Sequence, residues 1–117
     1  MILILSSDAV AAALLGALIE TLGYSVRFAR PLERYEDSIR RVRPKVCLVD
    51  SADPGMYSDG FLGRAGMRGV SVIVFGSIEA LDRVRLLALE HAIETILVPA
   101  DAVTLGTTLE RALQKVG

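Results

Sequence analysis

The sequence predicts an α/β fold: a doubly wound sheet of five parallel strands, each followed by a helix, forming a (βα)5 three-layer sandwich. Two observations lead to this prediction. Apolar segments of strand length alternate with segments of helical character five times along the 117 residues. Strands that are apolar throughout, joined by helices, are typical of a parallel sheet covered on both faces. We expect one domain over residues 1–117, a length that suffices for one core.

Five strands are predicted from short apolar runs that end in polar, Gly or Pro residues. In the second run, apolar and polar residues alternate and β-branched and aromatic residues occur, whereas the other runs are almost continuously apolar. In chain order, the predicted strands are Met1–Leu5, Tyr24–Ala29, Val46–Val49, Val70–Phe75 and Thr95–Val98.

Capping residues and prolines define the first two helices. Asp8 is a suitable N-cap for a helix over Ala9–Leu22, and Gly23 suits the turn that ends it. Pro31 can occupy the first turn of a second helix, and Pro44 ends that helix. The apolar face of the second helix is predicted from residues at helical spacing: Leu32, Tyr35, Ile39 and Val42.

The second half of the chain contains weaker signals. Asp53-Pro54-Gly55 is turn chemistry. Five glycines between positions 55 and 69 make any helix after the third strand weak and favour an irregular, mobile connection there. A helix over Leu81–Ala92 follows the fourth strand. Asp101 can cap the last helix, whose apolar stripe is Leu105, Leu109, Ala112 and Val116.

Composition excludes several classes of protein. A net charge of −1 argues against direct nucleic-acid binding, and a single Cys excludes a disulfide framework or a cysteine-built metal site. The longest uncharged run, Ala9–Ile19, has 11 residues and is too short to span a bilayer. No positively charged segment precedes it, as one would in a signal peptide. We therefore expect a cytoplasmic domain without membrane contact.

The carboxyl ends of the strands are where ligands bind in a doubly wound sheet. Asp50 is the only acid placed directly at a predicted strand end, which makes it the main candidate for a functional group. A capping role in the following turn is an equally good interpretation from the sequence alone. The other residues predicted at this edge are Ser6, Ser7, Asp8, Ser51, Gly76, Ser77, Val98 and Pro99.

The segment around Asp50 resembles a known family. Val46–Asp50, followed by Ser51-Ala52-Asp53-Pro54-Gly55-Met56, resembles the phosphoacceptor strand and loop of the receiver domains of bacterial response regulators. Val72–Phe75 is similar to the fourth strand of that family, and Leu97-Val98-Pro99 stands in place of its Lys-Pro step. The resemblance covers nearly the whole chain. It implies a flavodoxin-like, CheY-like fold, a role in two-component signalling, and Asp50 as the equivalent of the phosphoacceptor.

The resemblance fails at most residues that carry the family's chemistry. Ser6 and Ser7 stand where the family has an acidic pair, Gly76 where it has Thr or Ser, Val98 where it has Lys, and Thr95 where it usually has an aromatic residue. Mg²⁺ needs hard oxygen ligands, usually carboxylates, and phosphoryl transfer needs positive charge near the acceptor. Asp8 and Asp53 are the nearest alternative ligands. We therefore expect no bound metal, no cofactor and no enzymatic activity.

Three functions remain as hypotheses. The leading one is a pseudo-receiver, a signalling module that acts by phosphorylation-independent contact with a protein partner or in a homodimer. Such a domain can belong to a longer chain with an output or kinase domain. The alternative is a receiver that accepts phosphate at Asp50 with non-standard metal ligands. The third is a small-ligand pocket at the same edge, which the lack of aromatic residues there disfavours.

The first predicted helix is the candidate interface. Its segment Ala9–Ile19 carries no charge on any face, whereas a helix that covers a sheet normally has a polar outer face. Leu15 and Ile19 lie one turn apart, and the apolar residues of this helix cover more than one stripe. We therefore predict that Leu15 and Ile19 face solvent in the monomer and form a contact surface.

Other polar or reactive residues have structural interpretations. Cys47, in a central strand, is expected to be a small buried residue, and His91 to interact with a helix C-terminus. A basic cluster is expected to be a solvated helix face that Glu33, Glu36 and Asp37 offset. The members of the cluster are Arg34, Arg40, Arg41 and Arg43.

Overall fold

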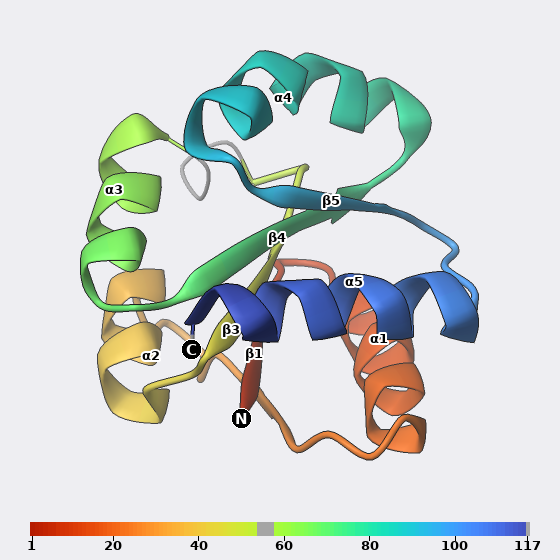
Figure 1. Cartoon of the computed structure of the whole chain (residues 1–117). Coiled ribbons are helices and arrows are strands. Elements are labelled where there is room, and N and C mark those ends of the chain that lie inside the picture. The colour runs from red at the N-terminus through yellow and green to blue at the C-terminus, as the bar shows by residue number, and fades with distance from the viewer. Residues whose placement is uncertain (54–57, 117) are drawn as a thin grey trace.

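The computed structural model describes residues 1–53 and 58–116 (Figure 1). Within these residues, one sheet of five parallel strands has the order β2-β1-β3-β4-β5. The strands are β1 (Ile2–Leu5), β2 (Val26–Phe28), β3 (Val46–Asp50), β4 (Ser71–Gly76) and β5 (Glu94–Leu97). The helices are α1 (Ala9–Thr21), α2 (Tyr35–Val42), α3 (Asp59–Met67), α4 (Ile78–His91) and α5 (Ala102–Val116). The predicted doubly wound fold is confirmed. Pro54, Gly55 and Met56, part of the predicted turn and of the family resemblance, lie outside the described residues.

The sheet has a core on each face because successive side chains of a strand point to opposite faces. In β1, Ile2 and Ile4 belong to the core that includes residues of α1 and α5, whereas Leu3 and Leu5 belong to the core that includes residues of α2 and α3. Figure 1 shows these two pairs of helices on opposite sides of the sheet. Burial on both faces explains why β1 and β3 are almost entirely apolar.

Local signals at the helix ends act as predicted. The Asp8 Oδ1 atom accepts hydrogen bonds from the N–H groups of Val10 and Ala11, both at 3.1 Å. The Asp101 Oδ1 atom accepts from the Thr104 N–H group at 2.8 Å. Both contacts satisfy backbone donors that have no partner inside the helix. Gly23 follows α1 with a φ of 97°, which only a residue without a Cβ atom adopts at low cost.

The second helix begins later than predicted. Pro31 lies in a four-residue turn, in which the Glu33 N–H group donates to the Arg30 carbonyl oxygen at 3.0 Å. Helix α2 begins only at Tyr35. Leu32 is in the left-handed region with a φ of 64°, and its side chain is fully exposed. The prediction that Leu32 belongs to the apolar face of this helix is therefore wrong.

The glycine-rich segment forms helix α3, where we expected an irregular connection. The Ser58 Oγ atom caps the helix by accepting a hydrogen bond from the Phe61 N–H group at 3.2 Å. Phe61, Leu62 and Ala65 are buried in the core on that face of the sheet. Burial of these side chains outweighs the low helix propensity of the glycines, which a reading of local propensity alone misses.

The remaining boundaries differ by a few residues. Helix α4 begins at Ile78 rather than Leu81, because the Ser77 Oγ atom accepts a hydrogen bond from the Ala80 N–H group at 3.3 Å and caps the helix. Strand β3 includes Asp50, and Val98 comes directly after β5.

The orientation of α1 differs from the prediction. Leu15 and Ile19 are 6% and 0% exposed, so they belong to the core and cannot form a contact surface. They lie on the buried stripe of α1, which is Ala12, Leu15, Gly16 and Ile19. The large apolar residues that α1 exposes are Val10 and Leu14, at 69% and 70%. None of the described helices has both the length and the hydropathy to cross a membrane.

Candidate functional site

Asp50 ends β3, the middle strand of the sheet, and both of its carboxylate oxygens accept hydrogen bonds. The Ser6 Oγ atom donates to Oδ2 at 2.7 Å, and the Ala52 N–H group donates to Oδ1 at 2.9 Å. The residue is only 9% exposed. The Ala52 contact is the turn-capping role considered for this aspartate. The Ser6 contact goes further, because it connects the loop after β1 to the end of β3.

The second serine of the pair bonds a second aspartate. The backbone N–H and the Oγ atom of Ser7 donate to the two carboxylate oxygens of Asp53, at 3.1 and 2.9 Å. We call Ser6–Asp50 and Ser7–Asp53 the serine–aspartate pairs. The Ser6 Oγ atom also accepts from the Asp8 N–H group at 3.0 Å, which extends the contact from Asp50 to the start of α1.

The carboxylates at this edge do not fit a Mg²⁺ site. Asp8 caps α1, and Asp53 accepts hydrogen bonds from both donors of Ser7. Asp50 accepts a hydrogen bond from the hydroxyl group of Ser6, which lies in the loop after β1. Mg²⁺ demands near-octahedral coordination by oxygen atoms. In the described part of the chain, no group of three or more His, Cys, Asp or Glu side chains could hold a metal ion. Hydrogen bonds therefore join the two loops at this edge.

The Ser51 side chain fills the space beside Asp50 that a side chain on Gly76 would occupy. Gly76 ends β4, and a Cβ atom built on it would lie 1.9 Å from the Ser51 Oγ atom and 3.0 Å from the Ser51 Cβ atom. Ser51 is buried, and its N–H group donates to the Phe75 carbonyl oxygen at 2.9 Å. A side chain at position 76 would force Ser51 to move. The hydroxyl group at this place thus comes from the residue after β3 and not from β4.

A pocket of about 570 Å³ lies over Asp50, and its wall contains a cation that sequence reasoning missed. Arg83 of α4 lines it together with Ser7, Ser77 and Val98. We expected no positive charge here, because Val98 stands in the place of the family's Lys. With α4 beginning at Ile78, Arg83 lies less than two turns from the sheet edge. The earlier helix start, signalled by Ser77, could have revealed it.

Two of the predicted site residues lie away from this pocket. Thr95 is exposed on the edge strand β5 and lines a different pocket against α4. Pro99 is exposed after β5 and lines an apolar groove against α1. Val98 is held near the site, because its N–H group donates to the Gly76 carbonyl oxygen at 3.0 Å. The structure therefore brings the serines, Gly76 and Val98 to Asp50, but not Thr95 or Pro99.

Tyr35, at the start of α2, is close enough to the site to respond to its charges. Burial raises the pKa of its phenol, and the negative charges of Asp53 and Asp50 raise it further. Tyr35 packs against the core on this face of the sheet. The sequence pattern identified it only as a residue of the apolar helix face.

Cys47 and His91 occupy the places predicted for them. Cys47 is fully buried in β3, and burial raises the pKa of its thiol well above the usual range, which keeps the thiol protonated and unreactive. His91 is the last residue of α4.

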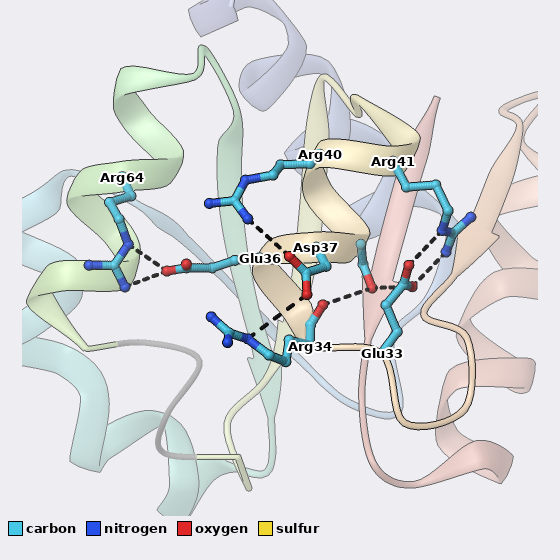
Figure 2. Close-up of polar contacts among 8 residues, drawn as sticks. Glu33, Arg34, Glu36, Asp37, Arg40, Arg41 and Arg64 are labelled. Carbon is cyan, nitrogen blue, oxygen red and sulfur yellow. Dashed lines mark hydrogen bonds and ion pairs between the residues drawn. The ribbon is translucent and has the colours of Figure 1, made fainter.

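The basic cluster is offset by neighbouring acids, as predicted (Figure 2). The pairs are Arg41 with Glu33 at 2.7 Å, Arg40 with Asp37 at 2.9 Å, Arg34 with Asp37 at 3.9 Å, and Glu36 with Arg64 of α3. The Glu36 pair connects α2 to α3. These contacts support the interpretation of α2 as a solvated helix face.

No protein-family model matches the chain, and a comparison with curated proteins finds no match. Solved structures show the same architecture. A response regulator receiver domain protein from Clostridium thermocellum superposes with a TM-score of 0.78 at 19% identity, over 97% of this chain and 94% of the other. A signal receiver domain of a modulated diguanylate cyclase from Desulfovibrio desulfuricans superposes with a TM-score of 0.72 at 26% identity, over 98% of this chain and 94% of the other. The beryllofluoride-activated NtrC4 receiver domain dimer superposes with a TM-score of 0.73 at 21% identity, over 99% of this chain and 98% of the other.

These neighbours agree with the resemblance that the sequence carries around Asp50. Each of them matches nearly the full length of both chains, so the similarity includes all five strands and helices. The chain therefore has the fold of the receiver domains of response regulators.

Proposed function

We propose that this domain is a pseudo-receiver: a signalling module that acts by protein–protein contact and not by phosphorylation of Asp50. The observation that carries the proposal is the serine–aspartate pairs, in which Ser6 and Ser7 donate hydrogen bonds to Asp50 and Asp53. Those two serines stand where receiver domains have an acidic pair. In this proposal the domain is cytoplasmic and has no enzymatic activity of its own.

Electrostatics supports this proposal. A phosphoryl group on Asp50 would bring close to two negative charges to a site that already holds Asp53 and Asp8 in the adjoining loops. Two unit charges 4 Å apart repel by about 4 kcal/mol at an effective dielectric constant near 20. The Ser6 hydroxyl group can satisfy a carboxylate, but it brings no net positive charge. Without a divalent cation, Arg83 is the one positive charge among the described residues lining this pocket that could compensate the charge that develops in phosphoryl transfer.

The compared structures support a signalling role in contact with other proteins. One is the receiver domain of a diguanylate cyclase, and another is a receiver domain dimer. By analogy, we propose that this domain contacts a partner protein, a second copy of itself, or an output or kinase domain in a longer chain.

One observation favours a second candidate function. Arg83 lines the pocket over Asp50, and a guanidinium group can form charge-assisted hydrogen bonds with a phosphoryl group. In this case Asp50 accepts phosphate with ligands that differ from those of the family.

Phosphorylation and Mg²⁺ binding distinguish the two candidates. We expect the wild-type protein to show no Mg²⁺ binding with a dissociation constant below about 1 mM. We also expect no phosphoryl adduct in its intact mass after incubation with acetyl phosphate. The double variant Ser6→Asp, Ser7→Asp supplies the missing acids and should gain Mg²⁺ binding in that range. A phosphoryl adduct on the wild type that disappears in Asp50→Asn and weakens in Arg83→Ala would support the second candidate and contradict the first.

A further inference from the structure

The turn between β2 and α2 displays a leucine in an unfavourable conformation. Leu32 is fully exposed and has a φ of 64°, in the left-handed region that disfavours residues with a Cβ atom. It occupies the third position of the turn 30–33, where Gly or Asn is usual when φ is positive. The Leu32 side chain is not buried by its own chain, so no hydrophobic contact compensates for the unfavourable backbone conformation. Strain of this kind is typical of functional positions.

A network of polar contacts holds this turn (Figure 2). The Nε and Nη2 atoms of Arg41 donate to the two carboxylate oxygens of Glu33, at 2.7 and 2.8 Å. Glu33 also accepts from the Arg30 N–H group at 3.0 Å and from the Ser38 Oγ atom at 2.6 Å. The hydrogen bonds from Arg41 are the main reason that the pKa of Glu33 lies well below its usual range, so this ion pair persists at neutral pH. These contacts hold the turn that presents Leu32.

The surroundings of Leu32 are basic. Residues 27–43 contain six arginines and three acids. All three acids are already paired with arginines: Glu33 with Arg41, Glu36 with Arg64, and Asp37 with Arg40 and Arg34. Arg27, in β2, and Arg30, the first residue of the turn, are both exposed. A partner for this surface needs an apolar pocket with acidic residues around it.

The groove between α1 and the segment after β5 has these properties. It measures about 230 Å³, ample for a leucine side chain, and apolar residues line it, including Leu14, Leu18, Val98 and Pro99. Asp8 and Asp101, both exposed, stand at the starts of the two helices beside it. The segments 1–26 and 95–110, which supply most of the groove, contain no Lys or Arg. The formal side-chain charges of these segments are all negative, opposite in sign to the arginines of the Leu32 turn, and Arg83 of α4 lines the adjoining pocket together with Asp8.

We infer that the Leu32 turn of one copy of this chain seats in the α1 groove of a second copy, with arginines of the turn facing Asp8 and Asp101 of the groove. The fit of size, polarity and charge supports a second copy as the occupant. The inference rests on the proposed function, because it names the partner that a phosphorylation-independent contact module requires.

Sedimentation velocity over a concentration series tests the inference with two variants and a matched control. Leu32→Asn removes the apolar side chain and relieves the turn, because Asn tolerates a positive φ. Leu14→Glu places a charge in the groove at a position that is 70% exposed. Leu86→Asn is the control, because Leu86 is 75% exposed on α4, away from both surfaces. Thermal unfolding confirms that each variant folds, and Leu32→Asn should melt at or above the wild-type temperature.

We expect wild type and Leu86→Asn to self-associate equally, and each of the other two variants to weaken association by at least about tenfold. Salt should weaken the wild-type association, because opposite charges contribute to it. An equimolar mixture of Leu32→Asn and Leu14→Glu should associate more strongly than either alone, since one retains the groove and the other the turn. A monomeric wild type, or association unaffected by Leu32→Asn, would overturn the inference. Either result leaves the proposed function standing if the wild type still fails to bind Mg²⁺ or accept phosphate.

Discussion

Replacing Ser6 by Ala should destabilise the domain by about 1.5–3 kcal/mol, the range for a hydrogen bond to a charged group. The Ser6 Oγ atom donates to Asp50 at 2.7 Å, and Asp50 is only 9% exposed, so water cannot readily replace the lost donor. The same substitution also removes the acceptor of the Asp8 N–H group. Ser7→Ala is the matched control. Its expected cost is within about 0.5 kcal/mol, because Ser7 is exposed and its backbone N–H group keeps its bond to Asp53.

Urea unfolding followed by circular dichroism measures both variants against the wild type, by linear extrapolation of the free energy of unfolding. A double-mutant cycle with Asp50→Asn separates the Ser6–Asp50 contact from the other effects of each substitution. Most of the loss in Ser6→Ala should be absent when Asp50 is already Asn. If Ser6→Ala and Ser7→Ala cost the same, or if the cycle shows no coupling, the Ser6–Asp50 bond does not hold this edge together. The physical argument for the proposed pseudo-receiver would then be refuted.

Leu15→Glu should unfold the domain, whereas Leu14→Glu should leave its circular dichroism spectrum unchanged. Truncating a buried leucine already costs about 2–5 kcal/mol of a total stability of about 5–15 kcal/mol, and a buried carboxylate adds to that cost. Gly76→Ser should cost about 1–3 kcal/mol because its side chain collides with Ser51, and thermal unfolding should show that adding Ser51→Gly recovers most of this loss. A larger loss in the double variant would contradict the steric account. The pKa of Glu33 is lower in the folded state than in the unfolded state. The ionised Glu33 side chain therefore contributes its full stabilisation above the ordinary glutamate pKa of about 4.3, and this stabilisation is lost as the pH falls through the lower folded-state pKa. Urea unfolding between pH 2 and 7 should therefore show a weaker loss of stability on acidification in Glu33→Gln than in the wild type, and equal slopes would be evidence against this ion pair.

The sequence by itself determined the order of the elements and the architecture. Strand-length apolar runs such as Val46–Val49 identify strands buried on both faces, and this identification needs no knowledge of neighbouring elements. The caps Asp8 and Asp101 act on backbone groups two or three residues away, so they too are readable from the sequence. The position of Asp50 at the sheet edge, and the serines in place of acids, are likewise properties of the chain.

Tertiary packing decided the features that local patterns leave open. In α1, apolar residues surround the helix, so no polar side indicates which residues face the sheet, and only packing buries Leu15 while exposing Leu14. In α3, contact of Phe61 and Leu62 with the core outweighs the glycines. Both results depend on surfaces that distant parts of the chain supply.

The site itself depends most on long-range geometry. The register of β1 on β3 pairs Leu5 with Val49, and this register places Ser6 beside Asp50 across 44 residues of sequence. The shared space of Ser51 and Gly76 depends in the same way on the register of β3 on β4. Sequence reasoning can name such residues because their types are visible along the chain. Which of them meet is decided only when the strands pair, because parallel strands are joined by helices and their contacts are distant in sequence.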